Sequence, residues 1–125
     1  MNLYAAHGGV LSLPGAATFA SASSGNTIQA SGAASRVDLS GLSTFVGGSS
    51  GATQMKVLGG GKVAASGDVA GRTVWTLDGS GGMFEVSGVT SLADAAVNVS
   101  GGAVMAFSSV TSLARNSFNA TAGGQ

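Results

Sequence analysis

The stretch Phe84-Glu-Val-Ser-Gly-Val-Thr-Ser-Leu92 returns 21 residues later as Met105-Ala-Phe-Ser-Ser-Val-Thr-Ser-Leu113. In both copies the apolar residues stand at the first, third, sixth and ninth positions. Apolar spacing by two indicates a β-strand with one buried face, and the following steps of three suit a tight corner better than a helix. The pair therefore predicts a strand that runs into a corner and repeats at a fixed period.

The same apolar template occurs nearer the N-terminus, and a weaker copy lies between. The first of these copies is Leu11, Leu13, Ala16 and Phe19, and the second is Val37, Leu39, Leu42 and Phe45. The weaker copy starts at Val63 and Ala65, so the five copies begin at 11, 37, 63, 84 and 105, with intervals of 26, 26, 21 and 21. In the weaker copy Asp68 and Gly71 fall where the others are apolar, which predicts a local irregularity.

A second short strand pattern precedes each template, with glycines between the two. Its copies are Leu3-Tyr-Ala5, Ile28-Gln-Ala30, Met55-Lys-Val57, Leu77-Asp-Gly79, Val97-Asn-Val99 and Phe118-Asn-Ala120. Glycine suits the turns between the patterns because it accepts positive φ. Each coil is thus strand, turn, strand and corner, and a single domain over 1–125 divides into coils 3–27, 28–54, 55–76, 77–96 and 97–117, with a partial coil 118–125.

No single copy can bury its apolar face, but stacked copies cover one another. The sequence therefore predicts an all-β fold, a single-stranded parallel β-solenoid (β-helix) of about five coils with 21–26-residue repeats. A β-sandwich is the rival fold, but it does not predict a fixed period. The expected core consists of the template residues Leu11, Leu13, Phe19, Val37, Leu39, Leu42, Phe45, Phe84, Val86, Val89, Leu92, Met105, Phe107, Val110 and Leu113.

Composition excludes several classes of protein. The 125 residues include 22 glycines and ten charged residues, five of each sign, so the formal net charge is zero and no basic surplus exists for nucleic acid. A hydrophobic content of 44% argues against disorder, and a single proline excludes collagen. No apolar run is long enough for membrane insertion, and residues 1–10 lack the basic start and apolar stretch of an export signal.

The repeats resemble a known group of proteins. The runs Ile28-Gln-Ala-Ser-Gly-Ala-Ala-Ser-Arg-Val-Asp-Leu-Ser-Gly-Leu-Ser-Thr-Phe45, Gly88-Val-Thr-Ser-Leu92 and Ser109-Val-Thr-Ser-Leu113 look like the degenerate β-solenoid repeats of large bacterial, planctomycete-like surface and adhesin proteins. That group is similar in architecture to filamentous-haemagglutinin-type stalks. The resemblance implies a module of an exported surface or matrix protein, located extracellularly or at the cell surface, and not an enzyme.

Few residues carry chemistry, and no catalytic residue, cofactor site or metal site is predicted. Asp38 and Glu85 fall in one outward column two coils apart, a separation close to that of the two carboxylates of an inverting glycosidase. Arg36 and Lys62 stand beside them, so a solvated face with compensated charge is the preferred interpretation. Asp68 and Arg72, followed by Trp75, form a candidate ligand site, because an aromatic face beside charged groups can bind a sugar.

Two insertions lengthen the first two coils at the same corner. They span residues 20–27 and 46–54 and are rich in Gly, Ser and Ala. Stacked loops are where solenoids often carry function, although tolerated surface insertions have the same appearance. We expect both to bulge from the corner of adjacent coils.

Three functions remain open from the sequence. The first is a non-enzymatic structural scaffold whose partners are further solenoid coils of a parent chain. The second is a subunit that stacks end to end with identical subunits into a fibre, since neither end carries an amphipathic cap. The third is a carbohydrate-binding or carbohydrate-cleaving β-helix with surface glycans as its ligand.

Overall fold

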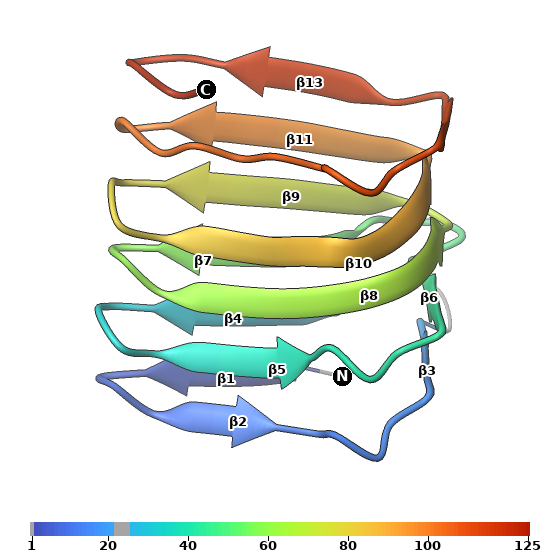
Figure 1. The fold of residues 1–125 in the computed structure, drawn as a ribbon, viewed down its shortest axis with the longest axis horizontal. Helices are drawn as coiled ribbons and strands as arrows, with labels where there is room; N and C mark the ends of the chain where they lie inside the picture. The colour runs from blue at the N-terminus through green and yellow to red at the C-terminus, as the bar shows by residue number, and fades with distance from the viewer. Residues whose placement is uncertain (1, 22–25) are drawn as a thin grey trace.

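A computed structural model describes residues 2–21 and 26–125, and in this part of the chain strands wind into a stack of coils (Figure 1). The described residues contain no helix, and all of the pairings between named strands are parallel. The fold is therefore the predicted all-β parallel solenoid, with about five turns.

Two sheets run the length of the stack. The first sheet contains one strand from each coil, in the order β1 (Asn2–Ala6), β4 (Thr27–Ser31), β7 (Thr53–Leu58), β9 (Thr73–Asp78), β11 (Ala95–Ser100) and β13 (Ser117–Ala120). The second sheet faces it across the core and contains β2 (Val10–Ser12), β5 (Arg36–Leu39), β8 (Lys62–Ala70), β10 (Met83–Ala93) and β12 (Ser112–Ala114). Short strands β3 (Thr18–Ala20) and β6 (Thr44–Val46) line the corner side, where β8 bends around to pair with β6 and β10 follows the same bend on the other side of β8 (Figure 1).

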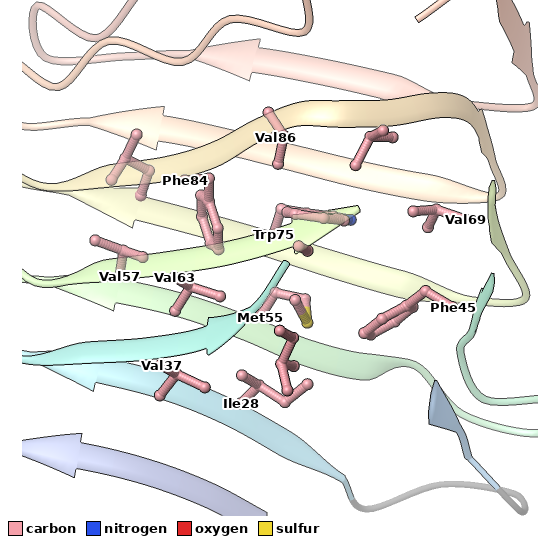
Figure 2. Close-up of a cluster of buried hydrophobic side chains, with 14 of the residues drawn as sticks. Ile28, Val37, Phe45, Met55, Val57, Val63, Val69, Trp75, Phe84 and Val86 are labelled. Carbon is pink, nitrogen blue, oxygen red and sulfur yellow. The ribbon is translucent and has the colours of Figure 1, made fainter. Parts of the chain in front are cut away.

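The core consists of inward columns in which each coil contributes one residue. In the first sheet one column runs through Leu3, Ile28, Met55, Trp75, Val97 and Phe118. The middle members of this column lie in the cluster of buried side chains in Figure 2, opposite Val37, Val63 and Phe84 of the second sheet. On the corner side Phe19 stacks on Phe45 with ring centroids 4.5 Å apart. Each coil thus covers the apolar residues of the next.

The irregularity predicted in the third coil is present, but its cause is a shorter corner. Asp68 pairs with Thr44, and Val69 pairs with Phe45, so Val69 occupies the buried column where Gly71 was expected. Val69 follows Val63 by six positions, whereas Phe45 follows Val37 by eight. The third coil therefore lacks two corner residues, and the apolar position is filled after all.

The same shortening shifts the alignment of the fourth coil with its neighbours by two residues. Trp75 pairs with Met55 on one side and Val97 on the other, while Leu77 pairs with Val57. The strand pattern of this coil is Trp75-Thr-Leu77, and the predicted pattern Leu77-Asp-Gly79 was wrong by two residues. The fourth coil begins with β9 at Thr73, before the predicted boundary at residue 77.

The predicted core residues are all buried in the inner coils, whereas at the ends of the stack only Phe19 is buried and most of the others are partly buried. Nine template residues are buried: Phe19, Val37, Leu39, Leu42, Phe45, Phe84, Val86, Val89 and Leu92. Four are only half-buried: Leu11, Met105, Phe107 and Val110. Leu13 and Leu113 are exposed, at 37% and 59%, because Leu13 follows β2 and Leu113 lies in β12, the strands at the two ends of the second sheet, and no further strand of the described residues covers them.

The fifth coil departs from the template along the second sheet. Residues 105–107 were expected to form a strand on β10, but no strand forms there, and β12 pairs with β10 only at Ser91–Ala93. The backbone of Met105 instead bonds to Gln125. A groove of about 390 Å³ therefore separates Met83–Ser87 from Val104 and Ala106. Phe107 nevertheless reaches the core and meets Trp75 edge to face, at 5.9 Å between centroids.

Glycine makes the short corner of the third coil feasible. Gly67 pairs with Val89 and has a φ of +87°, and a Cβ at this position would overlap the backbone carbonyl of Ser43. Positive φ strains any residue with a side chain, and the overlap leaves no room for one. The chain can therefore turn two residues early only with glycine at this point.

Replacing Gly67 with alanine is expected to destabilise the fold by about 3 kcal/mol, the sum of left-handed strain and overlap with Ser43. Gly81→Ala is the matched control, because Gly81 has a φ of +84° but nothing within 4 Å of the added Cβ. It should cost only about 1 kcal/mol. Urea unfolding monitored by circular dichroism measures both values, and equal losses would contradict the tight corner.

Candidate functional site

The three residues of the predicted ligand site do not form one site. Trp75 points into the core and is 0% exposed, whereas Asp68 and Arg72 are exposed. Trp75 Nε1 donates a hydrogen bond of 2.8 Å to Thr73 Oγ1, and its ring meets Phe84 edge to face. The indole is therefore part of the packing, and no sugar at the surface can stack on it. The predicted alignment of the fourth coil, which was wrong by two residues, explains why Trp75 was assigned to a surface site. It put Leu77 at the inward position that Trp75 occupies.

Asp68 lies on the corner side, where it joins neighbouring coils. Its Oδ1 accepts hydrogen bonds from Thr90 Oγ1 at 2.8 Å and from Ser91 Oγ at 3.1 Å. Both donors belong to β10, the next strand of the stack. The carboxylate thus ties the short third coil to the fourth.

The outward column with Asp38 and Glu85 lies where the sequence placed it. Asp38 and Glu85 both pair with Ala64, which stands between them. Arg36 reaches past this middle coil and donates two hydrogen bonds of 2.7 Å to the two carboxylate oxygens of Glu85. Its guanidinium also lies 3.7 Å from Asp38. Arg36 therefore connects the two carboxylates across three coils of the second sheet.

These contacts set the protonation of both acids. The hydrogen bonds from Arg36 lower the pKa of Glu85 below its usual value. Hydrogen bonds from Ser40, and secondarily the charge of Arg36, lower the pKa of Asp38. A general acid for glycoside cleavage needs a raised pKa, so both carboxylates are tuned in the opposite direction. The arrangement compensates charge on an open sheet face, which is the interpretation preferred from the sequence.

A second charged column stands at the corner where the strands of the first sheet begin. Register places Arg72, Asp94 and Arg115 on successive coils, directly before β9, β11 and the residues leading to β13. Arg115 donates hydrogen bonds of 2.6 and 3.0 Å to the two oxygens of Asp94 and thereby lowers the pKa of Asp94. The column therefore carries charges of plus, minus and plus, with a net charge of plus one.

This column borders a surface pocket of about 380 Å³. Arg72 and Arg115 stand two coils apart at this pocket, and its lining also includes Val74, Ala96 and Ser117, together with Ala52 on the coil before Arg72. Among the described residues, the guanidinium of Arg72 has no hydrogen bond or ion pair, whereas Asn116 uses its amide to bond the backbone at Leu92 and Ala95. The pocket thus combines apolar methyl groups with one unpaired cation.

The insertion at residues 46–54 holds the backbone of Arg72. Gly48 forms an antiparallel bridge with Arg72, and the carbonyl of Arg72 also accepts a bond of 2.9 Å from the amide of Thr53. A Cβ on Gly47 would overlap that carbonyl, so the loop fits closely on it. This insertion therefore packs against the next coil instead of only bulging outward. Of the other insertion, 20–27, residues 22–25 lie outside the described part of the chain.

The sequence interpretation missed Asp94 and Arg115 as partners. The signal was available, because the 21-residue period places Arg115 one coil above Asp94. Arg72 could not be assigned to this column from the sequence, because the short corner of the third coil shifts the alignment of the residues that follow it. The pocket itself depends on how the insertion folds, which no repeat pattern encodes.

No protein-family model, curated protein or solved structure matches this chain. Within residues 2–21 and 26–125, no group of three or more His, Asp or Glu side chains could hold a metal ion. The described part of the chain also has no helix that is long and apolar enough to cross a membrane.

Trp75 is expected to emit blue-shifted fluorescence that iodide does not quench, because the indole is buried among Phe84 and Phe107. Trp75→Ala should lower the free energy of unfolding by about 3–5 kcal/mol. Steady-state fluorescence and urea unfolding measure the two effects. Emission typical of exposed tryptophan, with strong iodide quenching in the folded protein, would contradict the inward placement.

Glu85→Gln should lower stability at neutral pH by at most about 1 kcal/mol, since the ion pair with Arg36 is partly solvated. Because the folded-state pKa of Glu85 is lowered, this contribution is complete above its ordinary value of 4.5 and is lost as pH falls below it. Thermal midpoints of wild type and variant should therefore converge as the pH falls from 4.5 through the lowered folded-state pKa of Glu85. A double-mutant cycle with Arg36→Met isolates the pair, and a coupling that persists unchanged in acid would refute the assignment.

Proposed function

We propose that this chain is a non-enzymatic structural module of an exported bacterial surface or matrix protein, contributing part of an adhesin-type stalk. The observation that supports this is the contrast between inner and end coils. Inner coils bury their apolar columns, whereas Leu113 and Phe118 at one end are 59% and 51% exposed. The outer edges of β1 and β13 are also unpaired within the described residues. Both ends therefore suit coverage by further coils of the same kind.

The charge pattern is consistent with a scaffold. The paired charges that join separate coils on the outer surface are compensated locally, as in Arg36 with Glu85 and Arg115 with Asp94. Such pairs hold neighbouring or next-neighbour coils in register and leave the acids ionised. The surface and stalk assignment also draws on the resemblance of the repeats to bacterial adhesin repeats.

A second candidate is a subunit that stacks end to end into a fibre. The exposed apolar residues at both ends favour it, because β1 of one copy could continue the parallel first sheet beyond β13 of another. The two candidates differ in the occupant of the ends. In a stalk the occupant is another segment of a parent chain, and in a fibre it is an identical chain.

Appending a further coil, a second copy of residues 105–125 after residue 125, tests the leading proposal, because the 21-residue offset makes the position after Gln125 the equivalent of Met105. The added coil should cover Leu113 and Phe118 and raise the thermal midpoint by about 4 °C or more, the shift expected for about 1 kcal/mol in a domain of this size. The control carries the same insert with its apolar residues changed to serine and should give no rise. A midpoint that does not rise with the intact coil would count against a module that is built to be extended.

Light scattering and electron microscopy of the unmodified chain distinguish the fibre. Filaments that Phe118→Glu abolishes, while the outward-facing control Met83→Glu retains them, would favour self-assembly over the stalk. A concentration-independent monomer would sink the fibre candidate. Antibodies against the chain should label intact source cells without permeabilisation, and labelling only after permeabilisation would overturn the surface assignment.

A further inference from the structure

We propose that the corner pocket beside Arg72 binds a carboxylate-bearing sugar unit of an acidic polysaccharide. This inference does not depend on whether the chain is a stalk module or a fibre subunit. It replaces the predicted site at Asp68, Arg72 and Trp75, of which only Arg72 lines this pocket. The site is supported by the unpaired guanidinium of Arg72, the neighbouring ion pair of Asp94 with Arg115 and the apolar lining.

Both the backbone amide and the backbone carbonyl of Arg72 are hydrogen-bonded, which fixes the position of its Cα atom. Its amide donates to the carbonyl of Gly48 at 2.9 Å, and its carbonyl accepts from the amides of Gly48 and Thr53 at 3.1 and 2.9 Å. The side chain is exposed, and no described residue pairs with it. An arginine anchored in this way presents its donors with less conformational freedom to lose when a ligand binds.

The charges around the pocket favour a ligand with a single negative charge. Both oxygens of Asp94 are taken by Arg115, so Asp94 is not available for a two-point contact with Arg72. Asp94 and Arg115 compensate each other's charge, so one positive charge, that of Arg72, is left for a ligand to neutralise, and a monoanion neutralises it. A planar carboxylate matches the fork of the Arg72 guanidinium and carries only one charge.

The lining of the pocket favours a sugar ring as the carrier of that carboxylate. Methyl groups of Ala52, Val74 and Ala96 offer an apolar surface for the C–H face of a ring, and the exposed hydroxyl of Ser117 lies on the opposite side from Arg72. The hollow has a volume of about 380 Å³ and is shallow and open to solvent, so it can contact one face of a ring without enclosing it. A uronic acid carries its carboxylate directly on a compact ring and presents C–H groups on one face, and therefore combines both features.

The surroundings of the pocket allow a polymer to continue beyond it. The outward column next to Val74 and Ala96 contains Thr76, Asn98 and Asn119 on β9, β11 and β13. These short polar side chains lie one above the other, and Asn119 Nδ2 donates to Asn98 Oδ1 at 3.3 Å. Adjacent sugar units can bond to such a column with their hydroxyl groups, so an oligosaccharide should bind better than a single uronate.

The test is a titration of the ¹⁵N-labelled full chain with trigalacturonate, followed by amide chemical shifts. We expect saturable shifts at Thr73, Val74, Ala96 and Ser117, with an affinity that falls as salt is added. Arg72→Gln should weaken binding about tenfold, the loss of one charged two-point contact. Lys62→Gln is the matched control, because Lys62 is an exposed cation on β8 of the second sheet, across the core from the pocket, and it should change affinity less than twofold.

Three further ligands test each part of the proposal. The methyl ester of trigalacturonate has no charge and should bind at least about tenfold more weakly, so equal binding would overturn the role of the carboxylate. A sulfated neutral trisaccharide that bound as tightly would overturn the preference for carboxylate. A glutamate-rich peptide of equal affinity would overturn the sugar.

Two results would overturn the site itself. One is the absence of saturable shifts at the pocket amides, and the other is an equal loss of affinity in Lys62→Gln and Arg72→Gln. Thermal unfolding of Arg72→Gln is the folding control, because the bonds of residue 72 to Gly48 and Thr53 are made by the backbone and should persist. Arg72→Lys keeps the charge without the fork and should bind with intermediate affinity.

Discussion

The structure depends on the in-register stacking of one coil on the next. Parallel pairing places equivalent residues about 4.8 Å apart, so every inward side chain is covered by its counterparts above and below. The buried column through Ile28, Met55 and Trp75 has this origin, as does the stacked pair Phe19 and Phe45. Since no coil can bury its apolar face without a neighbour, stability accumulates along the stack and falls at its ends.

The same register organises the outer surface. In-register stacking places outward residues of successive coils directly above one another. Acids and bases separated by one or two coils can therefore pair across the sheet. Arg36 with Glu85 and Arg115 with Asp94 are pairs of this kind. Arg72 is the exception among these columns, because its coil neighbour Asp94 is already occupied. An unmatched cation in an ordered column is a local departure from the repeat, and such departures are where a repetitive scaffold can acquire a binding site.

The sequence was sufficient for the fold class because apolar spacing and a fixed period constrain both strand and stacking. It was also sufficient for the shared column of Asp38 and Glu85, which requires only the register of the second strands. It was not sufficient at the third coil, where the corner lacks two residues. Aligning the copies by their first apolar residues could not detect this shortening. Trp75 was consequently interpreted as part of a ligand site, although it fills the position between Met55 and Val97.

By itself, then, the sequence determined that strands with one apolar face recur at 21–26 residues and must be stacked to be buried. Only the tertiary structure decided where the short corner shifts the alignment of the repeats by two residues and which template residues at the ends stay exposed. It also decided how the insertion at 46–54 hydrogen-bonds to the backbone of Arg72. The physical reason is that periodicity encodes which faces are buried, whereas corner length and loop packing depend on close fits such as Gly67 on Ser43 and Gly47 on Arg72. Those fits arise between residues of different coils, and no single repeat contains them.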